Sequence, residues 1–385
     1  MTGSRLELDG TFGEGGGQIL RTALSLSCVS GRAFRITNIR GRRPKPGLRK
    51  QHLVAVQAAQ QICGAEVSGA VLGSMELAFA PGAVRPGKYR FDITSAGSTT
   101  LVAQTLLPAL FLAAEPSQFV ITGGTHNPLA PPFDFVAEVF LPAIGLMGYR
   151  AEAQLQRHGF YPAGGGQISL AIEPRQLQER GHTGAPAATP LDLTAPPGDI
   201  EWTGRIYDSM LPPQVVEAER SLLRQAIPQV GRIEHVRVTD SPGPGNCIMV
   251  IGEWEQHACA STSMAPRMGK TILTAFGEKG KPARAVVEEL RDQLAQFVAA
   301  RATVDEHLAD QLLVYLALCA ASAESALRPA LGGGTPTPAA APCRFWTGRL
   351  SLHATTNVAV IEKFLPVRFS SEALPAGHGV SCTPA

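Results

Sequence analysis

The stretch His158-Gly159-Phe160-Tyr161-Pro162-Ala163-Gly164-Gly165-Gly166-Gln167-Ile168 places three consecutive glycines in front of an apolar residue. Because glycine lacks a Cβ, such a run lets the backbone adopt positive φ and approach another group closely. The phrase Gly-Gly-Gly-Gln-Ile occurs a second time, at residues 15–19. A phrase that recurs at a distance is typical of a duplicated supersecondary unit. We therefore predict an internal structural repeat; the alternative is two unrelated glycine turns.

Around this stretch, segments with a strand-like apolar period alternate with segments of helical period. Strands are predicted at 6–9, 66–72, 75–80, 88–94, from 119, and on both sides of the glycine stretch; helices are predicted to begin at 18, 48, 95 and 133. A first repeat ends near residue 95, and further repeat structure follows to about 184. This alternation favours a repeated α/β architecture over a helix bundle or an all-β fold.

A second compact pattern follows the proline-containing linker Pro186–Pro190. Its predicted strands lie near 199–206, 232–239, 246–254 and 257–263, and its predicted helix lies at 213–227. We interpret 185–280 as a smaller α/β insert domain with its own core. Within it, Asp240–Gly245 is interpreted as a turn with no further role.

The chain after residue 281 has the features of a last repeat. Helices are predicted at 282–300 and from 304, and a strand that turns into a helix is predicted at 349–357. The intervening residues 323–342 are rich in Ala, Pro and Gly, which predicts a mobile loop. The predicted large domain therefore comprises 1–184 and 281–369, and residues 370–385 form an irregular tail.

Composition limits the functional classes. A net charge of +2 in 385 residues requires any nucleic-acid surface to be local. The seven cysteines include no Cys-x-x-Cys pair, which argues against a disulfide framework or a thiolate zinc site and is typical of a reducing cytoplasm. The N-terminus has no apolar signal region, and no apolar run reaches membrane-spanning length. We expect a cytoplasmic protein without a membrane partner.

Two polar clusters in the first repeat are candidates for phosphate binding. Glu14, Gln18 and Arg21 have the spacing i, i+4, i+7, so a helix that begins at the glycine turn places them on one side. Backbone amides of the turn would face phosphate oxygens, although a solvated helix face fits the same pattern. The loop at 39–52 carries six basic residues within eleven positions, between prolines and glycines. We favour a phosphate-binding loop over a solvated basic loop, because the prolines fix the positions of the arginines.

Three further polar positions are candidates for nucleotide binding or catalysis. Gln104 is an amide in an apolar helical run, which suits either an exposed position or contact with a nucleobase edge. His307, Asp310 and Gln311 share one helix face and are suited to an adenine, although a polar helix face is an equal alternative. His353 stands where the predicted strand turns into a helix, and it is either a structural or a catalytic histidine.

These phrases together resemble the RNA 3′-terminal phosphate cyclases over most of the chain, from Leu6 to about Phe369. The resemblance rests on five segments: Glu14–Arg21, Arg40–His52, His158–Ile168, Glu306–Gln311, and His353 with Asn357. It implies a large domain of three βαβαββ-like repeats, interrupted by a smaller thioredoxin-like insert.

The resemblance also implies a covalent, ATP-dependent mechanism. His353 matches the histidine that attacks the α-phosphate of ATP and releases pyrophosphate. The RNA 3′-phosphate then takes the AMP, and the neighbouring 2′-OH displaces it to leave a 2′,3′-cyclic phosphate. Glu14 matches a carboxylate associated with a divalent metal, Mg²⁺ or Mn²⁺.

Two further groups of residues match family positions. Those matched to the phosphate or RNA-end site are Gln18, Arg21, Arg40, Arg43, Gln51 and His52. Those matched to the ATP pocket are Gln104, Pro131, His307, Leu308, Ala309, Asp310 and Gln311. His307 departs from relatives that carry tyrosine there; an imidazole still stacks, but its protonation would make ATP binding sensitive to pH.

Three other functions share parts of this pattern. A non-catalytic, cyclase-like ribosome-assembly scaffold has the same fold, and His353 argues against it. A polynucleotide adenylyltransferase would act mainly on 5′-phosphate ends. An enolpyruvyl-type transferase has related repeats but needs no nucleophilic histidine. Covalent AMP and the choice of polynucleotide end distinguish these alternatives.

Overall fold

The computed structural model describes residues 5–175, 191–256, 267–321 and 343–385. Within these ranges the chain forms four mixed four-stranded sheets and their covering helices, which confirms the predicted α/β class. The predicted strand at 257–263, the linker at 186–190 and the loop at 323–342 lie outside the described residues. No helix in the described part of the chain is long and apolar enough to cross a membrane.

Three of the four sheets are built in the same way. Their strand orders are β1-β2-β4-β3, β5-β6-β8-β7 and β9-β14-β16-β15. In each sheet the first two strands along the chain are parallel, and the fourth pairs antiparallel with both the second and the third. Helices cross between these strands in each unit. The three predicted βαβαββ repeats are therefore confirmed.

The bounds of the elements follow the chain. The first unit contains β1 (Leu6–Asp9), α1 (Gln18–Ser30), β2 (Phe34–Thr37), α2 (Lys50–Cys63), β3 (Glu66–Ser68) and β4 (Leu77–Ala80). The second contains β5 (Lys88–Asp92), α3 (Thr99–Phe111), β6 (Ser117–Gly123), the continuous helical segment α4 (Phe133–Phe135), η1 (Val136–Phe140) and α5 (Leu141–Gly145), then β7 (Ala151–Arg157) and β8 (Gly166–Ile172). The third contains β9 (Asp192–Leu193), α8 (Glu306–Ala320), β14 (Cys343–Thr347), α10 (Leu352–Phe364), β15 (Val367–Leu374) and β16 (Gly377–Pro384).

The two copies of the glycine phrase do not occupy equivalent places in these repeats. Residues 15–19 join β1 to α1, whereas residues 164–168 lead into β8, the last strand of the second unit. Gly15 and Gly164 both have positive φ, of 63° and 68°, so each turn requires glycine for its own reason. The structure confirms the repeat. The two glycine phrases that suggested it lie at non-equivalent places and are therefore not evidence for it.

Two predicted boundaries change. The strand at 88–92, expected in the first repeat, pairs with β6 and so begins the second unit. The expected irregular tail at 370–385 was wrong, because β15 and β16 form a hairpin whose second strand pairs with β14. Val380 and Cys382 alternate inward from β16 and are buried. Only two inward side chains of β16 are apolar, among Gly, Ser, Thr and Pro residues, and this alternation was too weak to predict a strand.

The fourth sheet, of order β11-β10-β12-β13, belongs to the insert between β9 and α8. Its elements are β10 (Glu201–Ser209), α6 (Pro213–Ala226), β11 (Val230–Arg237), β12 (Gly245–Gln256), β13 (Arg267–Phe276) and α7 (Ala283–Ala300). This βαβ–ββα order is that of the thioredoxin-like unit implied by the resemblance. Helix α7, expected in the large domain, instead shares the core of Trp202 and Trp254 through Leu290 and Phe297.

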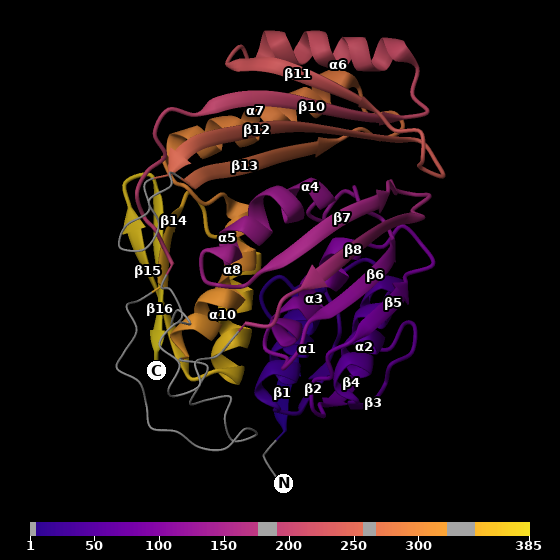
Figure 1. The fold of residues 1–385 in the computed structure, drawn as a ribbon, viewed down its shortest axis with the longest axis vertical. Helices are drawn as coiled ribbons and strands as arrows, with labels where there is room; N and C mark the ends of the chain where they lie inside the picture. The colour runs from indigo at the N-terminus through magenta and orange to yellow at the C-terminus, as the bar shows by residue number, and fades with distance from the viewer. Residues whose placement is uncertain (1–4, 176–190, 257–266, 322–342) are drawn as a thin grey trace.

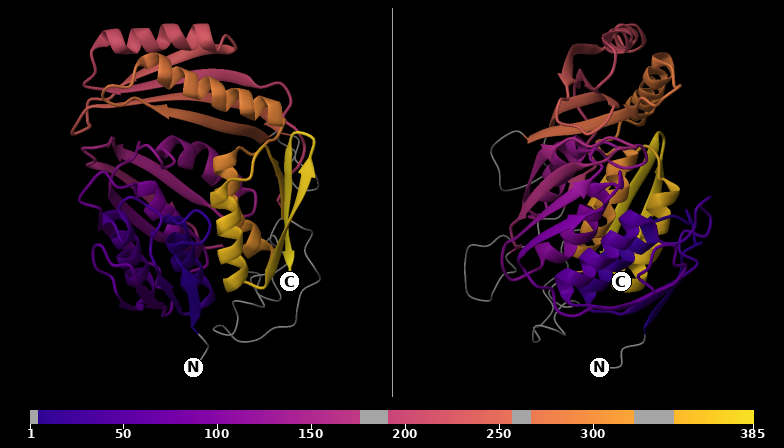
Figure 2. Two further views of the ribbon diagram at one scale, coloured as in Figure 1. Left: turned by 180° about the vertical axis from the view of Figure 1, so that it is seen from behind. Right: turned by 90° about the vertical axis from the view of Figure 1, so that its right-hand side faces the viewer.

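The insert stands above the three repeats, with α6 and α7 against its sheet, while α1, α3, α8 and α10 lie between the sheets of the large body (Figures 1 and 2). Nearly every residue of α3 and α8 is buried, which suits helices that are apolar on all sides. The polar residues at the ends of these central helices are consequently few, and they converge on one cavity.

Candidate functional site

A cavity of about 770 Å³ lies where the first turns of α1, α2, α8 and α10 meet the loop at 38–49 and the loop at 127–132. Its walls include nearly all of the predicted site residues: Glu14, Gln18, Arg21, Arg40, Arg43, Gln51, His52, Gln104, Pro131, His307, Asp310, Gln311 and His353. Residues separated by more than three hundred positions in the sequence are thus brought into one pocket.

Leu308 and Ala309 do not line this cavity. They lie on the inward face of α8 and are 3% and 1% exposed, within the main hydrophobic core. The continuous segment 307–311 was matched to the nucleotide pocket as a block, but on a helix only residues three or four apart share a face. His307, Asp310 and Gln311 face the cavity, and the two between them pack behind it.

Helix α1 contributes a chain of hydrogen bonds that leads to α10. Arg21 Nη2 donates to Gln18 Oε1 at 2.6 Å, and Gln18 Nε2 donates to Thr22 Oγ1 at 3.1 Å. Thr22 Oγ1 donates to Asn357 Oδ1 at 2.6 Å, and Asn357 Nδ2 donates to the Asp310 carbonyl at 3.0 Å. These contacts fix the amide and guanidinium groups in one orientation toward the cavity.

The Glu14 carboxylate is the acidic group on this wall. Its side chain is only 7% exposed and forms an ion pair with Arg43. Its Oε2 lies 3.8 Å from His353 Nδ1, and neither carboxylate oxygen has a hydrogen-bond donor of good geometry. Burying a carboxylate is costly unless its oxygens are satisfied, so this group is suited to a cation held in the cavity.

The cations of this wall come from the loop, as Arg40 and Arg43, while α2 contributes Gln51 and His52. Arg40 has a positive φ of 54° and donates to the carbonyls of Lys45 and Gly47, which holds the loop in shape. Gln51 Oε1 accepts from the Ser98 backbone amide at 2.9 Å. Burial, together with the charges of Arg21 and Arg40, lowers the pKa of His52 to about 3. His52 is therefore a neutral neighbour of the arginines.

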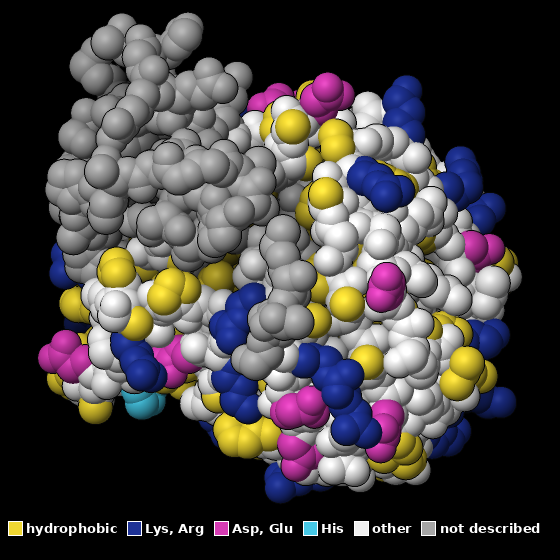
Figure 3. Space-filling model, turned by 90° about the horizontal axis from the view of Figure 1, so that it is seen from below, with side chains coloured by type: hydrophobic (Ala, Val, Ile, Leu, Met, Phe, Trp, Pro, Cys, Tyr) yellow, Lys and Arg dark blue, Asp and Glu magenta, His cyan; other side chains and the backbone are white. Residues whose placement is uncertain are grey.

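Positive charge is concentrated inside the cavity rather than spread over a broad area of the surface. On the face shown in Figure 3, basic side chains are interspersed with acidic and apolar ones. Inside the cavity, Arg21 is partly buried, and burial lowers its pKa to about 10, which leaves it charged at neutral pH. The local cationic surface expected from the small net charge is thus found in the pocket.

His353 lies at the second position of α10. Ser351 caps this helix: its Oγ accepts from the Ala354 amide at 2.9 Å and donates to Asp310 Oδ1 at 2.6 Å. The first amides of α10 therefore point toward the pocket mouth, where a helix N-terminus favours anions. Burial, with the charges of Arg21 and Arg43, lowers the pKa of His353 and keeps the imidazole neutral.

The opposite end of the cavity suits a neutral, planar group. The side-chain amides of Gln104 and Gln311 hydrogen-bond to each other across α3 and α8. The Pro131 carbonyl accepts from Thr100 Oγ1 at 2.7 Å, which fixes the proline on the wall. Burial raises the pKa of Asp310 to about 7. This end offers apolar surface with a few oriented amides, as small-molecule pockets generally do.

Some lining residues had no signal in the sequence. Thr274 and Phe276 come from β13, Lys281 comes from the turn before α7, and Gln293 comes from the middle of α7, all within the insert. They are ordinary side chains without a motif, and only the docking of the insert brings them to the cavity. The insert is thus a wall of the same pocket.

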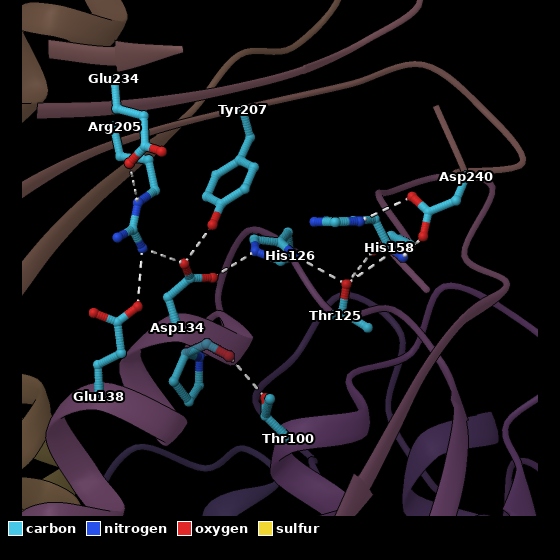
Figure 4. Close-up of polar contacts among 12 residues, drawn as sticks. Thr100, Thr125, His126, Asp134, Glu138, His158, Arg205, Tyr207, Glu234 and Asp240 are labelled. Atoms are coloured by element: carbon cyan, nitrogen blue, oxygen red, sulfur yellow. Dashed lines mark hydrogen bonds and ion pairs between the residues drawn. The ribbon is translucent and has the colours of Figure 1, made fainter. Parts of the chain in front are cut away.

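The glycine stretch at 158–168 lies outside the pocket and contacts the insert instead. His158 Nδ1 lies 2.9 Å from Asp240 Oδ1, and Pro242 packs against the position of Gly165 (Figure 4). A Cβ on Gly245 would collide with the Phe160 ring. The turn at 240–245, interpreted as having no further role, is therefore the partner of this stretch.

The fold and the pocket define the class: a three-repeat α/β protein that holds arginines, a histidine of lowered pKa and a helix N-terminus around one cavity. Comparison with known proteins agrees. The family model of the RNA 3′-terminal phosphate cyclases matches residues 12–371. The chain therefore belongs to the RNA 3′-terminal phosphate cyclase family.

Relatives of the same name match almost end to end. The RNA 3′-terminal phosphate cyclase of Koribacter versatilis is 44% identical over 365 residues, which cover 94% of this chain and 90% of the relative. That of Ralstonia nicotianae is 42% identical over 369 residues, covering 96% and 94%. That of Salmonella typhimurium is 40% identical over 373 residues, covering 97% of each.

Proposed function

We propose that this protein converts an RNA 3′-terminal phosphate to a 2′,3′-cyclic phosphodiester in an ATP-dependent reaction that passes through a histidyl-AMP on His353. The observation that carries the proposal is the position of His353. It is a neutral imidazole at the N-terminus of α10, in the cavity that Arg21, Arg40 and Arg43 also line. Relatives named as RNA 3′-terminal phosphate cyclases support the choice of reaction.

In the first step, a His353 nitrogen forms a bond to the α-phosphorus of ATP, and the bond to pyrophosphate breaks. The lowered pKa of His353 supports this role, because only the unprotonated nitrogen has a lone pair to donate. Arg21, which lines the same cavity, offsets the charge that collects on the departing pyrophosphate. The adenine is assigned to the end of the cavity that holds Gln104, Pro131 and Gln311.

In the second step, an oxygen of the RNA 3′-phosphate attacks the same phosphorus, and the bond to His353 breaks. The adjacent 2′-OH then attacks the 3′-phosphorus, AMP leaves, and the hydroxyl proton passes to solvent or to a base. The arginine wall faces the charged phosphates in each step. Gln18, Gln51 and His52 line the same end and are assigned to the RNA phosphate.

A divalent metal, Mg²⁺ or Mn²⁺, fits the cavity through Glu14. The carboxylate is nearly buried, and apart from the ion pair with Arg43 its oxygens have no hydrogen-bond partner of good geometry, so they are available to a cation. Mg²⁺ is commonly bound by one or two carboxylates together with substrate phosphates. When bound, the metal would neutralise phosphate charge. We further infer a cytoplasmic location, where RNA and ATP are both present.

Incubation of the protein with α-labelled ATP and Mg²⁺ or Mn²⁺, followed by denaturing electrophoresis, tests the proposal. Acid-labile label on the chain would support the histidyl-AMP. Matched oligonucleotides with 3′-phosphate or 5′-phosphate ends then identify the acceptor. A folded, ATP-binding protein that takes no label would refute the covalent mechanism and favour the scaffold. Transfer to 5′-phosphate ends alone would favour the end-capping adenylyltransferase.

Substitution of Arg40 and Arg43 tests whether these arginines act on the RNA phosphate or on ATP. We expect Arg40→Ala and Arg43→Ala to lower the turnover of 3′-phosphorylated RNA by more than they lower self-adenylylation, because these side chains are assigned to the RNA phosphate. The measurement is the rate of each step for wild type and variants at one ATP concentration. Equal losses in both steps would place the arginines on ATP instead.

A further inference from the structure

Two large apolar side chains are exposed directly beside the proposed catalytic residues. Phe12 is 52% exposed and lies two residues before Glu14, and Leu352 is 59% exposed and directly precedes His353. Neither lines the cavity. Single exposed leucines are ordinary, but a half-exposed phenylalanine in a tight turn at the edge of a phosphate pocket is not accounted for by packing.

Backbone contacts fix both side chains in place. The Glu14 amide donates to Thr356 Oγ1 at 3.0 Å, and Thr356 Oγ1 donates to the Leu352 carbonyl at 2.6 Å, so the turn at 10–15 rests on the first turn of α10. Arg42 Nη1 donates to the Gly13 carbonyl at 3.0 Å. The turn that carries Phe12 is therefore held between α10 and the basic loop.

The basic loop presents charge next to this turn that the proposed catalytic steps do not use. Arg42, Lys45, Arg49 and Lys50 are exposed, and none of them forms an ion pair with another described residue. Arg43, by contrast, is paired with Glu14 inside the pocket. Uncompensated cations beside an exposed aromatic ring are the combination with which proteins bind single-stranded nucleic acid.

We propose that Phe12 and Leu352, with Arg42 and Lys45, form a binding surface for the single-stranded RNA nucleotides that immediately precede the terminal phosphate. The base of the nucleotide next to the end stacks on Phe12, and its phosphate lies against Arg42 and Lys45. This inference rests on the proposed function, because it requires the RNA 3′-phosphate to enter the cavity beside His353. A fully paired duplex end offers no unstacked base to Phe12.

The chemistry of the second step supports this direction of entry. The RNA phosphate attacks the adenylate from the side opposite His353, which is the side that the pyrophosphate leaves. Arg40 and Arg43, which line the same cavity, are assigned to that side in this proposal, and the chain of the RNA must continue outward from it. The residues at the outer edge of this wall are those of the loop at 42–45 and the adjoining turn at 10–13.

A length series of substrates tests the surface. Oligonucleotides of one to six nucleotides, all single-stranded and 3′-phosphorylated, are compared by KM and kcat of cyclisation. In the wild type we expect KM to fall when the second nucleotide is added. Phe12→Ala should raise KM roughly 5- to 100-fold for substrates of two nucleotides or more, and Phe12→Trp should restore it. The mononucleotide should not distinguish the variants, because it has no preceding nucleotide whose base could stack on the ring.

Charge is tested separately by the salt dependence of binding. Each phosphate contact removed from a single strand should reduce the slope of log affinity against log salt by about 0.7. We expect Arg42→Gln and Lys45→Gln each to have this effect with a labelled 3′-phosphorylated hexanucleotide. Met210→Ala, an exposed apolar side chain of the insert, is the matched control and should change neither KM nor slope.

The outcomes distinguish this inference from the proposed function. One outcome is that the wild type takes AMP and cyclises RNA while Phe12→Ala shows the same dependence of KM on oligonucleotide length. That result would overturn the proposed RNA-binding surface and leave the proposed function standing. If the wild type takes no AMP, fluorescence anisotropy with the same hexanucleotide still tests whether this surface binds RNA. Equal affinity of wild type and Phe12→Ala in that assay would overturn it, and weaker binding by the variant would support it.

Discussion

His353→Ala is expected to abolish covalent labelling of the chain by α-labelled ATP, with a fall of at least about 10³-fold in the rate of AMP transfer. The reason is that the bond to AMP would form at an imidazole nitrogen, and among the histidines of the described ranges that line this cavity, only His353 pairs with Glu14. His307 and His52 also line the cavity, but the pKa of His52 is lowered to about 3 by burial among arginines, and its Nδ1 accepts the Arg49 amide.

The measurement is label retained after denaturing electrophoresis, with folding checked by circular dichroism and ATP binding checked by equilibrium dialysis. His378→Ala is a matched control, because His378 lies in β16 of the same repeat and outside the cavity. It should label as the wild type does. Label that persists on His353→Ala would remove His353 from the chemistry, and loss of label from both variants would mean that the substitution disturbs the fold.

Local sequence patterns predicted most helices and strands, because each depends on neighbours within a few residues. The helix that begins at Gln18 and the one that ends at Cys63 follow from apolar period and from the glycines beside them. The candidate site was also local in part, since Gln18 and Arg21 lie on α1 and Glu14 lies in the turn directly before it. The grouping of these residues with His353 came from the resemblance to a family, not from spacing.

What the sequence did not predict depends on long-range pairing. The glycine phrase at 164–168 has the same letters as that at 15–19, yet one precedes a strand and the other a helix, since their partners differ. In the phrase at 15–19, Gly15 lies against Arg42 of the basic loop, whereas in the phrase at 164–168 Gly165 lies against Pro242 of the insert. Likewise, α7 reads as an amphipathic helix from the sequence alone, and only contact with Trp202 assigns it to the insert.

The docking of the insert shows the same dependence on distant partners. Asp134 in α4 is 4% exposed, and its Oδ1 accepts from Arg205 Nη1 at 2.8 Å and Tyr207 Oη at 2.6 Å, both from β10 of the insert (Figure 4). Its Oδ2 lies 2.8 Å from His126 Nε2. Asp134 follows Pro131 by three residues, so this network also fixes the proline loop on the pocket wall.

Asp134→Ala is expected to lower the free energy of unfolding by about 3–5 kcal/mol, because it leaves the buried Tyr207 hydroxyl and the buried His126 ring without their shared carboxylate partner. Urea unfolding followed by tryptophan fluorescence is a suitable measurement, since Trp202 and Trp254 lie in the insert core. Asp292→Ala, which removes an exposed ion pair with Arg291, is the matched control and should cost less than about 1 kcal/mol.

The difference in unfolding free energy between wild type and Asp134→Ala should also depend on pH in a defined direction. Burial by itself raises the pKa of Asp134, but hydrogen bonds and charge from His126, Tyr207 and Arg205 hold it well below its usual range. A carboxyl whose pKa is lowered by folding stabilises the native state above its unfolded pKa of about 3.9 and loses that contribution as the pH falls further. The difference between wild type and Asp134→Ala should therefore be constant near neutral pH and shrink below about pH 4. A difference that stays constant through this acid range, or one no larger than that of Asp292→Ala, would show that the charge of Asp134 does not hold the insert in place.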